Sequence, residues 1–253
     1  MKTTETKKLK IAAIGDLHVH KKDNGHLVAL LSKINKAADI LLLAGDLTHT
    51  GDAKEANILL DALKVCSLPI VCVLGNHDYE KNQEKAIKEC LRQHESLQIL
   101  DGDSIVVEGI GIAGIKGFGG GFDNYMLTMF GEPEMKDFVQ KAVNESLKLE
   151  RALVRLDKED TNMIKIVLMH YSPCSQTVKG ENEQIFPFLG SSRLAEPLVR
   201  QNVIAVFHGH AHAGVLHGQI SNVKVFNVAQ PVLKKEGIED EYFLFELDVP
   251  IVT

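Results

Sequence analysis

The chain has 253 residues, of which 45% are hydrophobic and 25% charged, as in an ordinary globular protein. Its net charge of -6 gives no basic excess for gripping a nucleic-acid backbone, so we expect no nucleic-acid partner. We expect no membrane span, and four cysteines without a C-x-x-C pair predict reduced thiols in the cytoplasm. Because no flexible linker divides it, residues 1–253 are predicted to form a single domain.

The first third of the chain alternates apolar runs with helical patterns. Strands are predicted near residues 9–15, 39–44 and 69–74, and helices near 24–37, 52–66 and 80–94, which favours a parallel sheet. A hairpin around Gly109, near residues 104–115, predicts that the second half turns to antiparallel pairing. Further strands are expected near 164–169, 203–207, 214–220, 223–228 and 242–248.

The part between the hairpin and the strand near 164–169 is the most individual. The glycine-rich stretch from Gly117 to Phe122 cannot hold a regular element, and two alternatives stay open: a substrate-facing lid or a plain connection. A helix is predicted from Pro133 to Leu156, because apolar residues recur there at three- to four-residue intervals. We expect this helix to pack on a sheet.

Potential metal ligands follow five predicted strands directly. The ends of α/β strands are where such sheets present their ligand sites. The side chains are Asp, Asn and His without Cys, a set that suits zinc or a divalent transition metal with open coordination positions. They are Asp16, His18, Asp46, Asn76, His170, His210 and His212.

The spacing of these residues has a physical reason. Extended chain places residues i and i+2 on one face, so Asp16 and His18 can converge on one metal region. A glycine precedes Asp16, Asp46, Asn76 and His210, and it lets the backbone turn sharply as each strand ends.

These motifs resemble the calcineurin-like metallophosphoesterase superfamily, whose pattern is D-x-H, G-D-x-x-x-x-G, G-N-H-[DE], a lone His and G-H-x-H. Each motif alone is also consistent with a turn and a satisfied histidine, but all five occur in order between residues 16 and 212. The resemblance implies an α/β fold: a four-layer α-β-β-α sandwich of two mixed β-sheets, with a dinuclear metal site at the strand ends.

The resemblance also implies a ligand set for two divalent metal ions, with Mn, Fe and Zn left open as their identity. One ion would be held by Asp16, His18, Asp46 and His212, and the other by Asp46, Asn76, His170 and His210. Asp46 would bridge them. Such a pair lowers the pKa of a shared water, so a bridging hydroxide would attack the phosphorus of a small phosphoester substrate.

His77 and Asp78 are the predicted catalytic residues. By resemblance, His77 hydrogen-bonds or protonates the phosphoryl or leaving oxygen, and Asp78 would orient its imidazole through the other ring nitrogen. The alternative is that His77 is a structural histidine beside the ligand Asn76.

One substitution bears on the substrate class. Protein phosphatases of the superfamily carry G-D-x-V-D-R-G, and Thr50 stands here in place of the arginine that grips phosphate. The sequence is closer to the G-D-L-T-D-x-G pattern of many phosphodiesterases, although His49 replaces an Asp. A phosphodiesterase is therefore favoured. A phosphomonoesterase and a catalytically silent interaction scaffold are the alternatives, and the natural substrate and oligomeric state stay open.

No residue is assigned to substrate binding from the sequence, but several residues around the motifs have expected roles. The irregular segment from Tyr171 to Gly190 should form one wall of the substrate cleft, with Arg193 or Lys179 as phosphate contacts. Cys174 is expected to be a bystander thiol. Supporting roles near the metals are open for four further histidines: His20, His49, His208 and His217.

Overall fold

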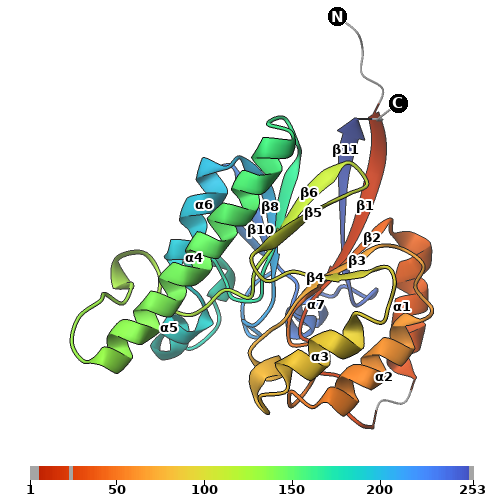
Figure 1. Ribbon diagram of the computed structural model, residues 1–253, viewed down its shortest axis with the longest axis horizontal. Coiled ribbons are helices and arrows are strands. Elements are labelled where there is room, and N and C mark those ends of the chain that lie inside the picture. Colours follow the sequence, from red (N-terminus) through yellow and green to blue (C-terminus); the bar gives the residue numbers. More distant parts are fainter. Residues whose placement is uncertain (1–5, 23–24, 251–253) are drawn as a thin grey trace, which may run out of the picture.

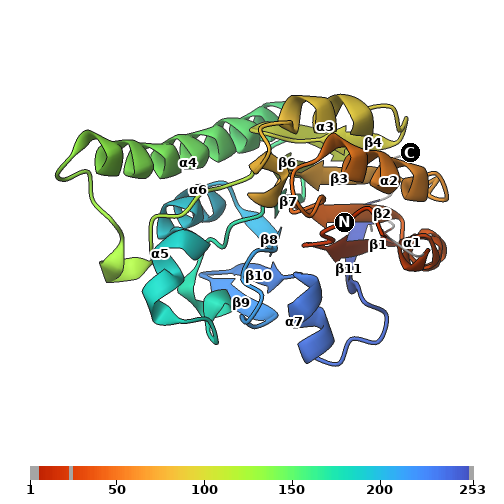
Figure 2. The same cartoon turned by 90° about the horizontal axis from the view of Figure 1, so that it is seen from below.

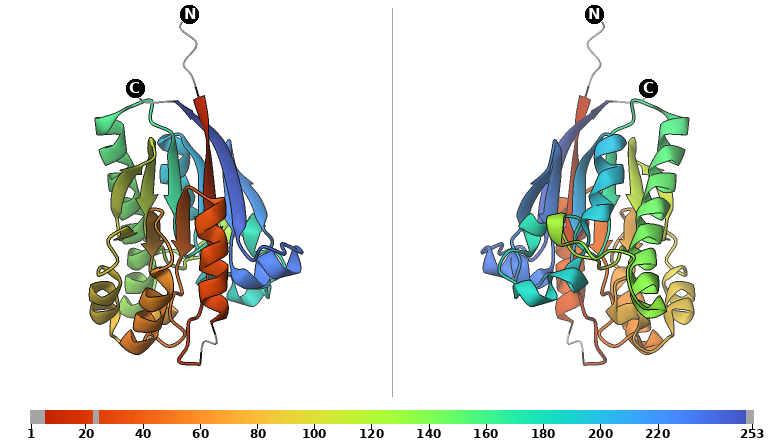
Figure 3. Two further views of the ribbon diagram at one scale, coloured as in Figure 1. Left: turned by 90° about the vertical axis from the view of Figure 1, so that its right-hand side faces the viewer. Right: turned by 90° about the vertical axis from the view of Figure 1, so that its left-hand side faces the viewer.

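The protein folds into two β-sheets packed face to face, with helices on both outer faces (Figures 1 and 3). The computed structural model describes residues 6–22 and 25–250. The strand order is β11-β1-β2-β3-β4 in the first sheet and β5-β6-β7-β8-β10-β9 in the second.

In the first sheet, four strands run parallel and one antiparallel. The parallel strands are β1 (Thr6–Ile14), β2 (Ile40–Ala44), β3 (Ile70–Val73) and β4 (Leu97–Ile99), and β11 (Phe243–Pro250) pairs antiparallel with β1. The helices α1 (His26–Ala37), α2 (Ala53–Leu63), α3 (Glu84–Leu91) and α7 (Gln230–Lys235) contribute buried side chains to the core on its outer face. Because both faces are covered, β2 is an uninterrupted apolar run with every residue buried.

In the second sheet, more of the neighbouring strands run parallel than the hairpin around Gly109 predicts. Its strands are β5 (Asp103–Val107), β6 (Ile110–Gly114), β7 (Lys165–Leu168), β8 (Val203–His208), β9 (His217–Ile220) and β10 (Val223–Asn227). Only the pairs β5–β6 and β9–β10 are antiparallel within it, whereas β6, β7, β8 and β10 run parallel. The long helix α4 (Pro133–Glu159) and the shorter α6 (Ala195–Arg200) supply the crossovers that parallel strands need.

Three layers of buried apolar side chains hold the sandwich together. One lies between the sheets, one under α1, α2, α3 and α7, and one under α4 and α6. This is the four-layer α-β-β-α sandwich of two mixed sheets that the sequence predicts.

Several predicted boundaries are wrong in detail. The expected helix near 80–94 is a short turn, η1 (His77–Tyr79), followed by α3, and the strand β4 was not predicted. Residue 24, where we expected the first helix to begin, lies outside the described residues. Within the described ranges, no helix is long and apolar enough to span a bilayer.

The irregular stretches contain short helical turns. These are η2 (Asp123–Tyr125), η3 (Ser175–Val178), η4 (Glu183–Ile185), α5 (Phe186–Leu189) and η5 (Ser192–Leu194). They lie on the side of the molecule that holds β8, β9 and β10, as Figure 2 shows.

Candidate metal centre

The predicted ligands come together where the carboxyl ends of both sheets meet. Asp16, Asp46 and Asn76 follow the first-sheet strands β1, β2 and β3, and His170 and His210 follow β7 and β8 of the second sheet. Potential ligand atoms lie within 4.8 Å of one another in three groups, among the residues that the structure describes. The groups are Asp16, His18 and His212; His18, Asp46 and His77; and Asp46, His170 and His210.

Backbone hydrogen bonds tie the strand ends to one another. The Asp16 amide donates to the Gly45 carbonyl at 3.0 Å, and the His18 amide donates to the Asp46 carbonyl at 2.9 Å. The two carboxylates also accept from neighbouring loops: Asp16 from the His210 amide at 3.0 Å, and Asp46 from the His77 amide at 2.8 Å. The donor atoms are thus fixed by main-chain contacts before any ion binds.

Four candidate ligands adopt the left-handed backbone conformation. The φ angles of Asp16, His18, Asp46 and His210 are 59°, 44°, 49° and 71°. Such conformations cost about 1 to 3 kcal/mol each for residues other than glycine, and they cluster at functional sites. The strain is retained here because both sheets hold the loops in place.

The preceding glycines act by two different means. Gly45 has a φ of 85°, so the predicted need for a sharp turn is met there. At Gly75 and Gly209 the reason is close approach, because an added Cβ would overlap the carboxylates of Asp46 and Asp16.

Ring orientations show which nitrogens are free to bind a metal. His170 Nδ1 lies 2.8 Å from the Ala44 carbonyl and must donate to it, which leaves Nε2 facing Asn76 Oδ1 at 2.9 Å. His210 Nε2 likewise donates to the Phe188 carbonyl at 3.1 Å, so Nδ1 carries the free lone pair. Such fixed tautomers are typical of metal-binding histidines.

The surroundings of the His18 imidazole show whether the site can hold a metal ion. Both of its ring nitrogens are buried without a hydrogen-bond partner, although carboxylates surround it and Asp46 Oδ2 lies 3.9 Å from Nε2. A buried imidazole with two unsatisfied nitrogens costs free energy unless something binds it. A divalent cation bound by His18 with Asp16 and His212, whose donor atoms lie within 4.8 Å of one another, would satisfy one of these nitrogens, so the residues present fit a metal ion.

The electrostatics favour positive charge at this position. Burial lowers the pKa of His170, but the attraction and hydrogen bonding of Asp46 outweigh it and raise that pKa to about 9. Burial and the neighbouring His170 lower the pKa of His210 to about 3, which keeps it in the neutral form that ligates metals. The field that raises the pKa of His170 would equally attract a cation to Nε2.

His77 lies beside the candidate ligands, but its orienting partner differs from the prediction. His77 Nε2 lies 4.0 Å from Asp46 Oδ2, and Nδ1 lies 2.7 Å from Glu80 Oε1 and 3.0 Å from the His49 carbonyl. Both neighbours of Nδ1 accept only, so Nδ1 carries a proton. Glu80, one turn further along the chain, is therefore the carboxylate that orients His77.

Asp78 holds two loops together instead of orienting His77. Its carboxylate is fully buried, and burial raises its pKa above the ordinary value despite the hydrogen bonds that it accepts. Oδ1 accepts from the amide and hydroxyl of Thr48, and Oδ2 accepts from the amides of Gly75 and Leu47. The expected contact between Asp78 and His77 is thus wrong, and Asp78 instead fixes the loop after β2 to the loop after β3.

The other predicted neighbours divide into two sets. His20, His49 and His77 form part of a ring cluster around His18, and His208 Nδ1 donates to the Gly209 carbonyl at 2.8 Å. His217 instead packs on Phe226 and Phe243, and Arg193 donates to the Leu127 carbonyl. Lys179 is exposed, and Cys174 is a buried free thiol near Thr177.

Sequence reasoning missed two residues that pack against the centre. The Tyr171 ring lies 4.3 Å from that of His210, and Lys116 Nζ lies 4.8 Å from the centre of the Tyr171 ring. Tyr171 follows a predicted ligand directly, which is the signal that could have found it. Nothing in the sequence marks Lys116.

The comparisons with known proteins agree with the fold and the motifs. The sequence model of the calcineurin-like phosphoesterase family matches residues 9–214, and the chain belongs to this family. No curated protein sequence matches the chain.

Several solved structures are similar. The phosphopantetheinyl hydrolase of Mycobacterium tuberculosis is 14% identical, with a TM-score of 0.67 over 93% of this chain and 95% of that one. The Thermus thermophilus protein TT1561 is 18% identical, with a TM-score of 0.56 over 94% and 99%. GAP50, the anchor in the inner membrane complex of Plasmodium, is 15% identical, with a TM-score of 0.52 over 88% and 72%. At these identities the likeness shows the fold alone.

Proposed function

We propose that this protein is a dinuclear-metal-dependent phosphoric ester hydrolase that favours small phosphodiesters. The observation that carries the proposal is the buried, unsatisfied imidazole of His18 among the carboxylates of Asp16 and Asp46. One ion would be held by Asp16, His18, Asp46 and His212, and the other by Asp46, Asn76, His170 and His210. Mn, Fe and Zn all suit this oxygen and nitrogen donor set.

Different residues of the chain have different roles around that centre. Two divalent ions, when bound, supply an activated water and polarise the phosphoryl oxygens. His77 presents Nε2 toward the same space, while Nδ1 is anchored to Glu80 and the His49 carbonyl. Because Glu80 and the His49 carbonyl hold the proton on Nδ1, Nε2 is the ring nitrogen that can take up a proton and pass it to the leaving oxygen.

The preference for diesters rests on the loop after β2. Thr50 occupies the position where protein phosphatases of the superfamily have their phosphate-gripping arginine. Its amide donates to Glu55 at 2.8 Å, and its hydroxyl lies 2.9 Å from Lys81 Nζ, which also contacts Asp52 at 3.2 Å. The protein therefore has no arginine at this position to neutralise the second negative charge of a phosphomonoester. A phosphodiester carries a single negative charge and needs that arginine less. A phosphomonoesterase stays the alternative within enzymes.

A silent scaffold is the alternative from another class, since GAP50 is described as an anchor. His77 and all seven candidate ligands are present in this chain, which favours the enzyme. The four cysteines are buried free thiols, which agrees with the cytoplasmic location that we propose.

The test combines metal analysis with two aryl esters. After saturation with Mn²⁺, the protein should hold two equivalents of metal and hydrolyse bis(p-nitrophenyl) phosphate faster than p-nitrophenyl phosphate. A clear monoester preference would favour the phosphatase, and two bound metals without activity on any phosphoester would favour the scaffold.

A further inference from the structure

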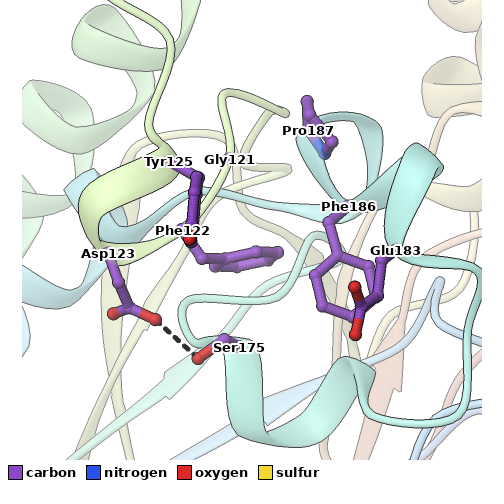
Figure 4. Close-up of a pocket in the computed structure, with 8 residues that line it drawn as sticks. All are labelled: Gly121, Phe122, Asp123, Tyr125, Ser175, Glu183, Phe186 and Pro187. Atoms are coloured by element: carbon purple, nitrogen blue, oxygen red, sulfur yellow. Dashed lines mark hydrogen bonds between the residues drawn. The ribbon is translucent and has the colours of Figure 1, made fainter.

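A cavity of about 540 Å³ lies between the glycine-rich segment and the segment around α5 (Figure 4). Its wall combines the rings of Phe122, Tyr125 and Phe186 with the carboxylates of Asp123 and Glu183. In the view of Figure 4 the Phe122 ring is drawn between Asp123 on one side and Glu183 and Phe186 on the other. Among the described residues, no lysine or arginine lines this cavity.

The cavity is built by two segments that the sequence leaves irregular. The Gly120 amide donates to the Pro187 carbonyl at 2.6 Å, and the Gly121 amide donates to the Gly190 carbonyl at 2.9 Å. Ser175 donates to the Asp123 carboxylate at 2.7 Å and fixes its position, while Asp123 itself has a left-handed φ of 53°. The glycine-rich loop is therefore pinned to the segment around α5 as a wall, and a free lid is not needed to form the cavity.

The cavity and the metal centre share a wall. Phe188, in the same helix α5 as the lining residue Phe186, accepts the hydrogen bond that orients the imidazole of His210. Ala211, between the candidate ligands His210 and His212, packs in one apolar cluster with Phe122 and Leu189. The described lining contains no candidate ligand, so α5 and this apolar cluster are what connect the cavity to the centre.

The lining selects by charge. Two carboxylates in a described lining that has no lysine or arginine repel a second phosphate or a carboxylate, and aromatic rings attract organic cations at their faces. The Phe122 and Phe186 rings meet edge to face at 6.1 Å, and because Phe122 is buried, the partly exposed Phe186 and the exposed Tyr125 present the aromatic surface. Such surfaces with nearby carboxylates suit alkylammonium groups.

We propose that this cavity binds an organic ammonium group, such as the amino-alcohol arm of a phosphodiester substrate. The substrate class rests on the proposed hydrolase function, but the binding of ammonium does not. Asp123 and Glu183 supply the opposing charge, and Phe186 and Tyr125 supply the aromatic surface.

The kinetic test compares two p-nitrophenyl diesters that differ only in charge. p-Nitrophenyl phosphorylcholine should have a kcat/KM about tenfold above that of p-nitrophenyl 3,3-dimethylbutyl phosphate, its uncharged isostere, in line with cation–π and charge contributions of about 1 to 2 kcal/mol. In the double variant Asp123→Asn, Glu183→Gln, the ratio should fall to about one. Asp61→Asn removes an exposed carboxylate on α2 and should leave the ratio unchanged. Equal rates for the two esters in the unaltered protein would overturn the proposal.

A direct binding test separates this proposal from the hydrolase. Phenyltrimethylammonium is not a substrate, and its binding to the full-length chain can be followed by saturation-transfer NMR with and without Mn²⁺. Saturable binding that the double variant weakens at least about tenfold would support the cavity's role even in a protein without hydrolase activity. Hydrolysis of aryl diesters without such binding, or tighter binding of adenosine than of the ammonium, would overturn the cavity's role and leave the hydrolase standing.

Discussion

The metal centre and the neighbouring cavity are built in opposite ways. The centre is made by short turns at strand ends, where amide-to-carboxylate contacts and left-handed residues fix the donor atoms. The cavity is made by two long loops pinned to each other at a few points, with exposed rings such as Tyr125 at its rim. Rigid strand ends suit chemistry that tolerates little displacement, and loops suit selection among substrates. Changes in lining residues such as Asp123 and Glu183 should therefore alter specificity while leaving the reaction intact.

Removal of the bridging carboxylate should have the largest effect, and it tests whether the metal centre can be disrupted while the cavity stays intact. Asp46→Asn should lower kcat on bis(p-nitrophenyl) phosphate by at least about 1,000-fold, because it weakens both metal sites and loosens the contact with the His77 amide. Elemental analysis should give less than two equivalents of metal, whereas phenyltrimethylammonium binding should persist. A variant with two metals and near-normal kcat would disprove the bridging role.

His77 should matter most when the leaving group is poor. His77→Ala should keep both metals but lose about 100-fold in kcat on alkyl diesters, and noticeably less on p-nitrophenyl esters, because p-nitrophenolate needs little protonation. The comparison requires kcat for both ester types and a metal count for each variant. Equal losses on both types would make His77 a binding contact, and loss of a metal would make it structural.

Asp78 should affect stability more than chemistry. Asp78→Asn places an amide N–H₂ against buried N–H donors such as those of Gly75 and Leu47, which should cost about 2 to 4 kcal/mol of unfolding free energy. Urea unfolding monitored by circular dichroism measures this loss, with Asp61→Asn as an exposed control on α2. At a temperature where the variant stays folded, kcat on p-nitrophenyl esters should fall less than it does in His77→Ala. A kcat loss equal to that of His77→Ala without destabilisation would restore the orienting role that the sequence suggests.

The sequence predicts the metal centre far better than the cavity, for a physical reason. Strand-end ligands such as Asp16 and His170 are recognisable because spacing, preceding glycines and residue type are all local. The roles of Asp78 and Glu80 depend on which way a single turn of η1 faces, and the pattern G-N-H-D does not encode that direction. The cavity depends on pairing between Gly120 and Pro187, 67 residues apart, and no periodicity reports such a contact. The parallel order of β6, β7, β8 and β10 was missed similarly, because the hairpin turn at Gly109 is local and the crossovers are not.

Substitution of Glu80 should give the smallest loss of kcat, and this loss distinguishes a residue that acts through His77 from one that acts by another route. Its Oε1 lies 2.7 Å from His77 Nδ1, but half of its side chain is exposed, so water can replace part of the contact. Glu80→Gln keeps an acceptor for the Nδ1 proton but replaces the carboxylate beside the ring with a neutral amide, so we expect a loss of about three- to tenfold in kcat on alkyl diesters. On p-nitrophenyl esters the variant should match the unaltered protein, and so should the control Glu84→Gln at the start of α3 on both ester types. The expected pattern is that of His77→Ala at a smaller scale, because Glu80 acts only through His77. A double variant His77→Ala, Glu80→Gln should then be no slower than His77→Ala alone, and a further loss in it would show that Glu80 acts by another route.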